Sequence, residues 1–304
     1  MTAERGPGRA SAGHARADVA DVVDAADVVQ EGADPAPRER AGADTATVAR
    51  RTGYQAQWRY LVAALGYFTR VPIPHAIALD AHDLAGAARY FPLIGVLVGA
   101  VGALVYLMAL SLFPAGVAVL LSMAATLLLT GALHEDGLAD CCDGLGGGMT
   151  RDDALRIMRD PHLGAFGAIG LMLSLALKWQ TLTALPAAAT AAWAMVGAHA
   201  ASRALAITYL ATHAYAREHG KAKRVAQPMS KRSLAVALML GLPWLFVPDW
   251  RAGVLGLAVI AALRLVLGRY LARRLGGYTG DCLGFAQQVF EIALYLTVLA
   301  WTSF

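Results

Sequence analysis

Long apolar runs, each about the length of a bilayer crossing, constrain this chain more than any other feature. A helix needs around 20 apolar residues to cross about 30 Å of hydrocarbon. Runs of that kind lie at 91–112, 115–134, 164–186, 188–212, 233–250, 252–272 and 283–303. Only 16% of the residues are charged and 57% are hydrophobic, too few polar groups to cover a water-soluble protein of this size. The sequence therefore predicts an all-α, polytopic membrane helical bundle with about seven transmembrane helices.

Two N-terminal segments differ from these runs. Residues 53–74 are shorter, contain Arg59 and Arg70, and end in prolines, which predicts an interfacial or re-entrant helix. Residues 1–52 are rich in Ala, Asp, Arg and Gly and have no aromatic residue, which predicts a disordered tail without the pattern of a secretory signal. Residues 53–304 are then predicted to form one membrane-embedded domain.

Basic residues alternate between loops, which predicts the orientation of the chain in the membrane. Short loops rich in Lys and Arg stay in the cytoplasm. With the N-terminus inside, the outer loops hold only Arg251, and the inner loops hold Arg151, Arg156, Arg159, Arg217, Lys221, Lys223, Arg224, Lys231, Arg232, Arg269, Arg273 and Arg274. The net charge of +4 is scattered rather than gathered on one face, so no nucleic-acid partner is expected.

An acidic motif, HEDGLADCCDGLGGG (134–148), directly follows the second apolar run and falls on the cytoplasmic side. If the helix of that run continues through the motif, Asp136, Asp140 and Asp143 lie within an arc of about 60°. Carboxylates crowded in this way repel one another without a cation. Oxygen ligands at this spacing suit Mg²⁺ or Mn²⁺. The alternative, a solvated acidic helix end, is disfavoured because aspartates at a helix C-terminus oppose the macrodipole.

The residues after the motif predict a turn and a short capped helix. Glycines 146–148 allow the backbone to turn and to approach a bulky ligand, or simply end the helix. Thr150 and Asp153 have the spacing of a helix cap. Arg156 and Arg159 on that helix would meet phosphates, with lipid headgroups as the alternative.

Charged residues inside apolar runs are costly and usually mark function. Arg203 is predicted to contact a phosphate or to pair with an acid such as Glu291. Lys178 lies nearer the outer half of its run, where snorkelling to the interface is the expected explanation. Asp281 begins the last helix, and Gln287, Gln288 and Glu291 follow it. Gln287 and Glu291 are four residues apart, and the group predicts a second polar cluster at the depth of the first.

The cysteines raise a zinc site as a competing idea. Cys141 and Cys142 are adjacent, so on a helix they point about 100° apart, and neither is in a Cys-x-x-Cys spacing with Cys282. Zinc is therefore disfavoured. His134 is instead predicted to be a hydrogen-bonding or proton-handling residue at the edge of the acidic site, with simple packing as the alternative.

Several segments together resemble one enzyme family. HEDGLADCCDGLGGG followed by RIMRDPHLGAFGAIGLMLSLALKW is similar to the signature region of the cobalamin synthases, the adenosylcobinamide-GDP ribazoletransferases. Further similar segments are FTRVPIP (68–74), RYFPLIG (89–95), SRALA (202–206), AYAREHGKA (214–222) and GYTGDCLGFAQQ (277–288), in the family's order. Residues 1–52 lie outside the resemblance, and Pro161 and His162 depart from the serine and arginine of many relatives.

The resemblance implies a Mg²⁺-dependent phosphotransfer at the cytoplasmic face of the bacterial inner membrane. The family joins adenosylcobinamide-GDP to alpha-ribazole or its 5′-phosphate and releases GMP, late in vitamin B12 assembly. Asp136, Asp140 and Asp143 are then expected to hold the metal, with Glu135 or Asp143 as general base or supporting acid. The residues expected to contact substrate are His134, Arg156, Arg159, Asp160, His162, Arg203, Asp281, Gln287 and Glu291.

Two other classes of protein fit parts of the pattern. An ion-coupled membrane transporter would also place acids and glycines in apolar helices, but it predicts related halves and a central site. The sequence has no internal repeat, and its acids cluster at one membrane face. A structural scaffold would leave the three aspartates unexplained. Nothing in the sequence sets the oligomeric state, so a homo-oligomer is left open.

Overall fold

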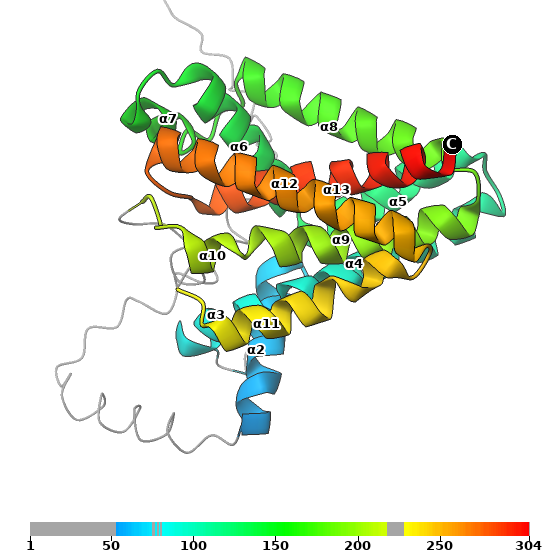
Figure 1. Cartoon of the computed structure of the whole chain (residues 1–304), viewed down its shortest axis with the longest axis horizontal. Coiled ribbons are helices and arrows are strands. Elements are labelled where there is room, and N and C mark those ends of the chain that lie inside the picture. The colour runs from blue at the N-terminus through cyan, green and yellow to red at the C-terminus, as the bar shows by residue number, and fades with distance from the viewer. Residues whose placement is uncertain (1–52, 75–76, 78, 80, 218–227, 304) are drawn as a thin grey trace, which may run out of the picture. The chain divides into compact units, whose positions relative to one another are not determined.

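The computed structural model describes residues 53–303 except 75–76, 78, 80 and 218–227. The predicted disordered tail, 1–52, lies outside the described residues. The described chain is built from helices, with one isolated β-bridge between Tyr215 and Tyr278 (Figure 1). The prediction of an all-α helical bundle is confirmed.

The described residues form twelve α-helices and two 3₁₀ helices. Their bounds are α2 Gly53–Phe68, α3 Ala81–Ala87, η4 Ala88–Tyr90, α4 Phe91–Leu110, α5 Ala115–Thr130, α6 Leu133–Gly147, α7 Arg151–Ile157, α8 Ala165–Thr183, α9 Ala188–Ala206, α10 Tyr209–Thr212, α11 Lys231–Gly241, η6 Pro243–Phe246, α12 Trp250–Leu275 and α13 Gly280–Ser303.

The predicted count of seven membrane crossings is not confirmed. Among the described residues, four helices are long and apolar enough to cross, and a fifth crossing is added if the bent pair α5 and α6 is counted as one. The predicted run 233–250 is broken because Pro243 cannot continue α11, which has only 11 residues. α2 has 16 residues and is not among the crossing helices, in agreement with the non-spanning helix predicted at 53–74.

A sharp break separates α5 from α6. Gly131 and Ala132 both adopt left-handed backbone conformations, with φ of 64° and 57°, and the two helices meet at 89°. Gly131 tolerates this conformation because it has no Cβ. The expectation that the acidic motif continues the second apolar helix was therefore wrong: the motif forms its own helix, α6.

α13 is the helix around which the described bundle is organised. It packs against α6, α8, α9 and α12, so the acidic helix contacts the C-terminal helix directly (Figure 1). α4 and α9 approach very closely, since a Cβ at Gly99 would lie 2.7 Å from the Cα of Val196. Small residues allow such backbone contact between membrane helices.

The side chains of two arginines donate hydrogen bonds to backbone carbonyls and so join three loops at one end of the bundle. Arg151 donates from Nε to the carbonyl of Leu275 at 2.9 Å and from Nη2 to the carbonyl of Ala216 at 2.9 Å. Arg274 donates to the carbonyl of Gly148 at 2.7 Å. The loops after α6, α10 and α12, all predicted to be cytoplasmic, therefore lie together.

We predict that Gly99→Val destabilises the protein by about 1–3 kcal/mol, because the added side chain forces α4 away from α9. The measurement is thermal unfolding of the purified protein in detergent. Ala100→Val is the matched control, since Ala100 is the next residue of α4 and is exposed. Equal melting temperatures for the two variants would contradict the close packing at Gly99.

Candidate active site

Carboxylates from two helices meet beside α6. Gly137 packs its backbone on the start of α13, where a Cβ would lie 2.9 Å from the carbonyl oxygen of Asp281. Asp140 is half-buried and within electrostatic range of Asp136, Asp281 and Asp143. The structure thus adds Asp281, from α13, to the acidic face that the sequence predicted on α6.

Arg217 is a site residue that the sequence analysis treated only as a loop charge. Its Nη2 lies 2.6 Å from Oδ2 of Asp281, and its side chain is only 10% exposed. Its buried Nε has no hydrogen-bond partner among the described residues. The available signal was its place within the family segment AYAREHGKA. A guanidinium with a spare donor beside carboxylates is suited to hold a phosphate.

Asp143 faces a different neighbour from the other acids. Its two carboxylate oxygens accept hydrogen bonds from the backbone N–H groups of Gly164 and Gly167, each at 2.8 Å. These amides belong to the N-terminus of α8, where a negative charge complements the helix dipole. A Cβ at Gly164 or Gly167 would overlap the Asp143 carboxylate. The metal role predicted for Asp143 stays a prediction, and the observed role is to hold α8 on α6.

Tyrosines line the loop side of this region. The rings of Tyr215 and Tyr278 are 5.5 Å apart in an edge-to-face contact. Burial raises the pKa of Tyr278 to about 12. Burial, together with Tyr215 and Asp281, raises the pKa of Tyr67 to about 12 as well. These hydroxyls therefore stay protonated at neutral pH and add hydrogen-bond donors without negative charge.

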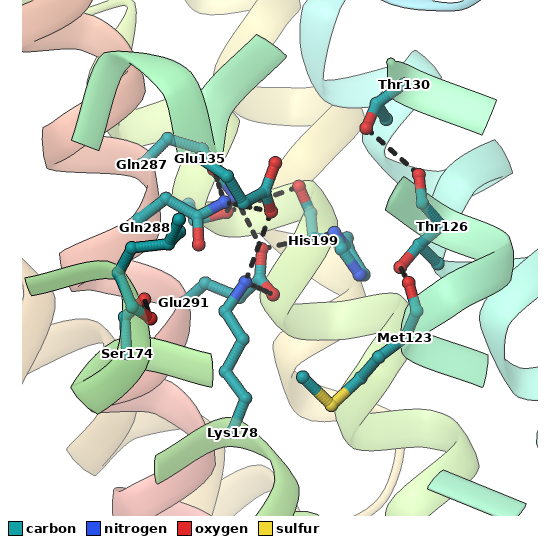
Figure 2. Close-up of polar contacts among 12 residues, drawn as sticks. Met123, Thr126, Thr130, Glu135, Ser174, Lys178, His199, Gln287, Gln288 and Glu291 are labelled. Atoms are coloured by element: carbon teal, nitrogen blue, oxygen red, sulfur yellow. Dashed lines mark hydrogen bonds and ion pairs between the residues drawn. The ribbon is translucent and has the colours of Figure 1, made fainter. Parts of the chain in front are cut away.

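A second polar cluster lies behind α6, inside the bundle (Figure 2). Lys178 of α8 places its Nζ 2.8 Å from Oε1 of Glu291 and 3.8 Å from Oε1 of Glu135. Nδ1 of His199 lies 3.2 Å from Oε2 of Glu291. Lys178 is 5% exposed, so the expected snorkelling to the interface was wrong. Its side chain points inward because the carboxylates of Glu135 and Glu291 lie there.

Amide side chains connect this cluster to α6. Gln287 donates to Oε2 of Glu291 at 2.6 Å, and Gln288 donates to Oε1 of Glu135 at 2.9 Å. Arg203 donates to the carbonyl of His199 at 2.9 Å and is buried with it. Gln287 and Glu291 of the predicted second cluster are thus brought together inside the helix bundle, where Glu135 and Arg203 join them. Asp281, predicted in the same cluster, lies on the acidic face instead.

His134 and the cysteines occupy packed positions. The ring of His134 stacks on Phe68 with centroids 5.7 Å apart, which is the packing alternative considered for it. The sulfurs of Cys141 and Cys282 lie 3.8 Å apart and are buried between α6 and α13. These contacts hold α6 to α2 and α13.

The predicted phosphate-binding residues after the motif are exposed. Thr150 and Asp153 form the reciprocal cap predicted for α7. Nη2 of Arg156 lies 3.5 Å from Oδ1 of Asp153. Asp160 accepts from the backbone and side chain of His162, and these bonds lower the pKa of its carboxyl. α7 packs against α6, and these side chains, with that of Arg159, are exposed to a ligand.

The donors on α6 suit a magnesium ion that is shared with a substrate. No group of three or more His, Cys, Asp or Glu side chains in the described part of the chain is arranged to hold a metal by itself. Mg²⁺ usually takes one or two carboxylates and completes its shell with waters and substrate phosphates. Asp136 and Asp140, one helical turn apart, provide such a pair.

Comparison with known proteins identifies the family. Residues 60–299 match the profile of cobalamin-5-phosphate synthase. The chain belongs to the cobalamin-5-phosphate synthase family. The match runs from within α2 to within α13. It therefore includes the acidic helix α6, the second polar cluster and Arg217.

Curated relatives in the family carry one name. An adenosylcobinamide-GDP ribazoletransferase of Ralstonia nicotianae is 59% identical over 249 residues, 81% of this chain and 96% of the relative. One from Ralstonia pickettii is 54% identical over 81% of this chain and 97% of its own length. One from Shewanella frigidimarina is 42% identical over 80% and 95%. No solved structure matches this chain.

We predict that Asp143→Ala and Gly167→Ala loosen the same contact from its two sides. Loss of a carboxylate that caps a helix lowers the free energy of unfolding by about 0.5–2 kcal/mol. A methyl group at Gly167 displaces the Asp143 carboxylate from the amides at the start of α8. Both variants should speed hydrogen–deuterium exchange at residues 163–168. Asp152→Ala, an exposed acid on α7, serves as the control. Unchanged exchange in the first two variants would refute the anchoring of α8.

Proposed function

We propose that this protein joins adenosylcobinamide-GDP to alpha-ribazole, or to alpha-ribazole 5′-phosphate, and releases GMP. The observation that carries the proposal is the family match over residues 60–299, together with relatives up to 59% identical that are named for this transfer. The ion-coupled transporter has no such support. The acidic face with Arg217 beside it is chemically suited to a diphosphate substrate.

The proposed reaction is a phosphoryl transfer. A ribose hydroxyl of the ribazole forms a bond to the phosphorus that bears the cobinamide arm, and the bond from that phosphorus to the oxygen of GMP breaks. The hydroxyl proton passes to a carboxylate of the acidic face, and GMP leaves as a phosphate monoester. Such a reaction depends on positioning and on neutralising phosphate charge.

Residues of the site have different roles in the proposed transfer. Asp136 and Asp140 would hold Mg²⁺, which neutralises the phosphate oxygens when bound. Arg217 binds a phosphate oxygen after exchanging its contact with Asp281. Asp143 fixes α8, and its contacts leave Asp136, Asp140 and Asp281 as the carboxylates open to substrate. Residues of α7 and the following loop contact the phosphate, the nucleotide or the ribose of the substrate, namely Arg156, Arg159, Asp160 and His162.

We further propose that this site faces the cytoplasm in the bacterial inner membrane, with the N-terminus inside. The support is the joining of the loops after α6, α10 and α12 at one end by Arg151 and Arg274. At the other end, Trp301 donates a hydrogen bond to Asp249 and Trp179 donates one to the carbonyl of Gly116, near loops almost free of basic residues. Tryptophans are typical of membrane interfaces.

The decisive experiment measures GMP release by purified protein in lipid vesicles supplied with adenosylcobinamide-GDP and alpha-ribazole. We expect GMP and the joined corrinoid to form in equal amounts with Mg²⁺, and turnover to stop when EDTA removes the metal. The assay is repeated with alpha-ribazole 5′-phosphate. A folded protein that forms no product with either acceptor would reject the proposed function.

Asp140→Asn is expected to lower turnover at least about a hundredfold while the protein remains folded in the membrane, because an amide is a poor ligand for Mg²⁺. The measurement is the initial rate of GMP release per folded protein. Asp152→Asn, an exposed acid on α7, should keep the full rate. Wild-type turnover in Asp140→Asn would remove Asp140 from the metal site.

A further inference from the structure

Four charged side chains from four helices meet inside the bundle. Lys178 comes from α8, Arg203 from α9, Glu135 from α6 and Glu291 from α13. Lys178 bridges the two carboxylates, and Arg203 is within electrostatic range of both (Figure 2 shows the lysine and the two glutamates). We call these four residues the buried charge cluster.

The buried charge cluster is balanced, with two cations and two carboxylates. Burying charge in a membrane protein is expensive unless each charge is paired and hydrogen-bonded. Glu291 satisfies this requirement fully: Lys178, His199, Gln287 and Tyr295 all contact its carboxylate. Removing one of the four side chains leaves an unpaired charge, and the side chain that carries it has to move or be hydrated.

Glu135 is the member that can move. Its Oε1 contacts Gln288 and Lys178, but its buried Oε2 has no hydrogen-bond partner among the described residues. A cavity of about 20 Å³, lined by Glu135, Lys178 and Glu291 among others, lies beside it. That is room for one water molecule. Glu135 is therefore held from one side only, chiefly by Lys178 and Gln288.

Glu135 is also the residue next to Asp136 on α6. Side chains of one helix share a rigid backbone, so a rotation that changes the direction of Glu135 changes that of Asp136 and of Asp140 one turn later. A displacement of about 1 Å at a reacting centre can cost about a hundredfold in rate. The contacts of Glu135 inside the bundle thus set the directions of Asp136 and Asp140 on the acidic face.

We infer that Lys178 is a positioning residue: by neutralising the carboxylates of Glu291 and Glu135 it keeps Glu135 in its contact with Gln288, which fixes the rotation of α6 and so aims Asp136 and Asp140 at the substrate. This inference rests on the proposed function for its effect on turnover. It assigns Lys178 no contact with substrate. Its action passes through Glu135.

The test compares single and charge-balanced variants in the GMP-release assay. Lys178→Met leaves an uncompensated carboxylate and should lower kcat about a hundredfold, with the Mg²⁺ concentration for half-maximal rate raised about tenfold. Lys178→Met combined with Glu135→Gln restores the charge balance, and its amide oxygen still accepts from Gln288. The double variant should recover most of the rate and of the Mg²⁺ response.

A second readout does not depend on turnover. Cys141 on α6 and Cys282 on α13 have their sulfurs 3.8 Å apart, so their cross-linking reports the rotation of α6. Diamide forms the disulfide by taking two electrons and two protons from the thiol pair and becoming a hydrazine. In a Cys142→Ala background, we expect the loss of two free thiols to be several-fold slower in Lys178→Met than in the parent, and normal in the double variant.

Ser174→Ala is the matched control, one turn before Lys178 on α8, where the hydroxyl bonds only its own helix. It should match the parent in every readout. The inference is overturned if Lys178→Met cross-links and responds to Mg²⁺ like the parent, or if the double variant is as inactive as Lys178→Met, which would show that Glu135 itself acts on substrate. Failure of the proposed function can be told apart from failure of this inference. In that case the parent releases no GMP, and the cross-linking comparison still decides whether Lys178 positions α6.

Discussion

A helix with four carboxylates, set among apolar helices, has to be held by partners that satisfy its charges. α6 meets this requirement differently along its length. Near its start, Glu135 pairs with Lys178 and Gln288. Near its end, the Asp143 carboxylate caps the N-terminus of α8. Asp136 and Asp140, between these anchors, keep carboxylates for a ligand. The rest of the site depends on this division between held and open charges.

The two anchors explain why acids and bases gather on both sides of α6. Charge buried behind the helix is balanced within the protein, by Lys178 and Arg203 against two glutamates. Charge in front of it is balanced only in part, by Arg217 on Asp281. A divalent cation would complete the balance on that face. The arrangement suits a diphosphate substrate that is bound through such a cation and through Arg217.

The proposed transfer needs little covalent chemistry from the protein. Its demands are a fixed diphosphate, an oriented hydroxyl and neutralised oxygens, which place a premium on rigidity. The close contact of α4 with α9 and the arginine bonds that join the loops at one end provide that rigidity. The residues of α7 that we propose to contact the nucleotide are exposed.

The sequence by itself determined the fold class, the acidic motif, the cap of α7 and the family resemblance, because hydropathy, short-range spacing and motif order are local properties of the chain. Tertiary structure decided the rest. The bend at Gly131 and Ala132 turned the motif away from α5, and Pro243 shortened a predicted crossing. Lys178 turned inward, Arg217 joined Asp281, and Asp143 met the amides of α8. The last three outcomes pair groups far apart in sequence, so no local pattern contains them.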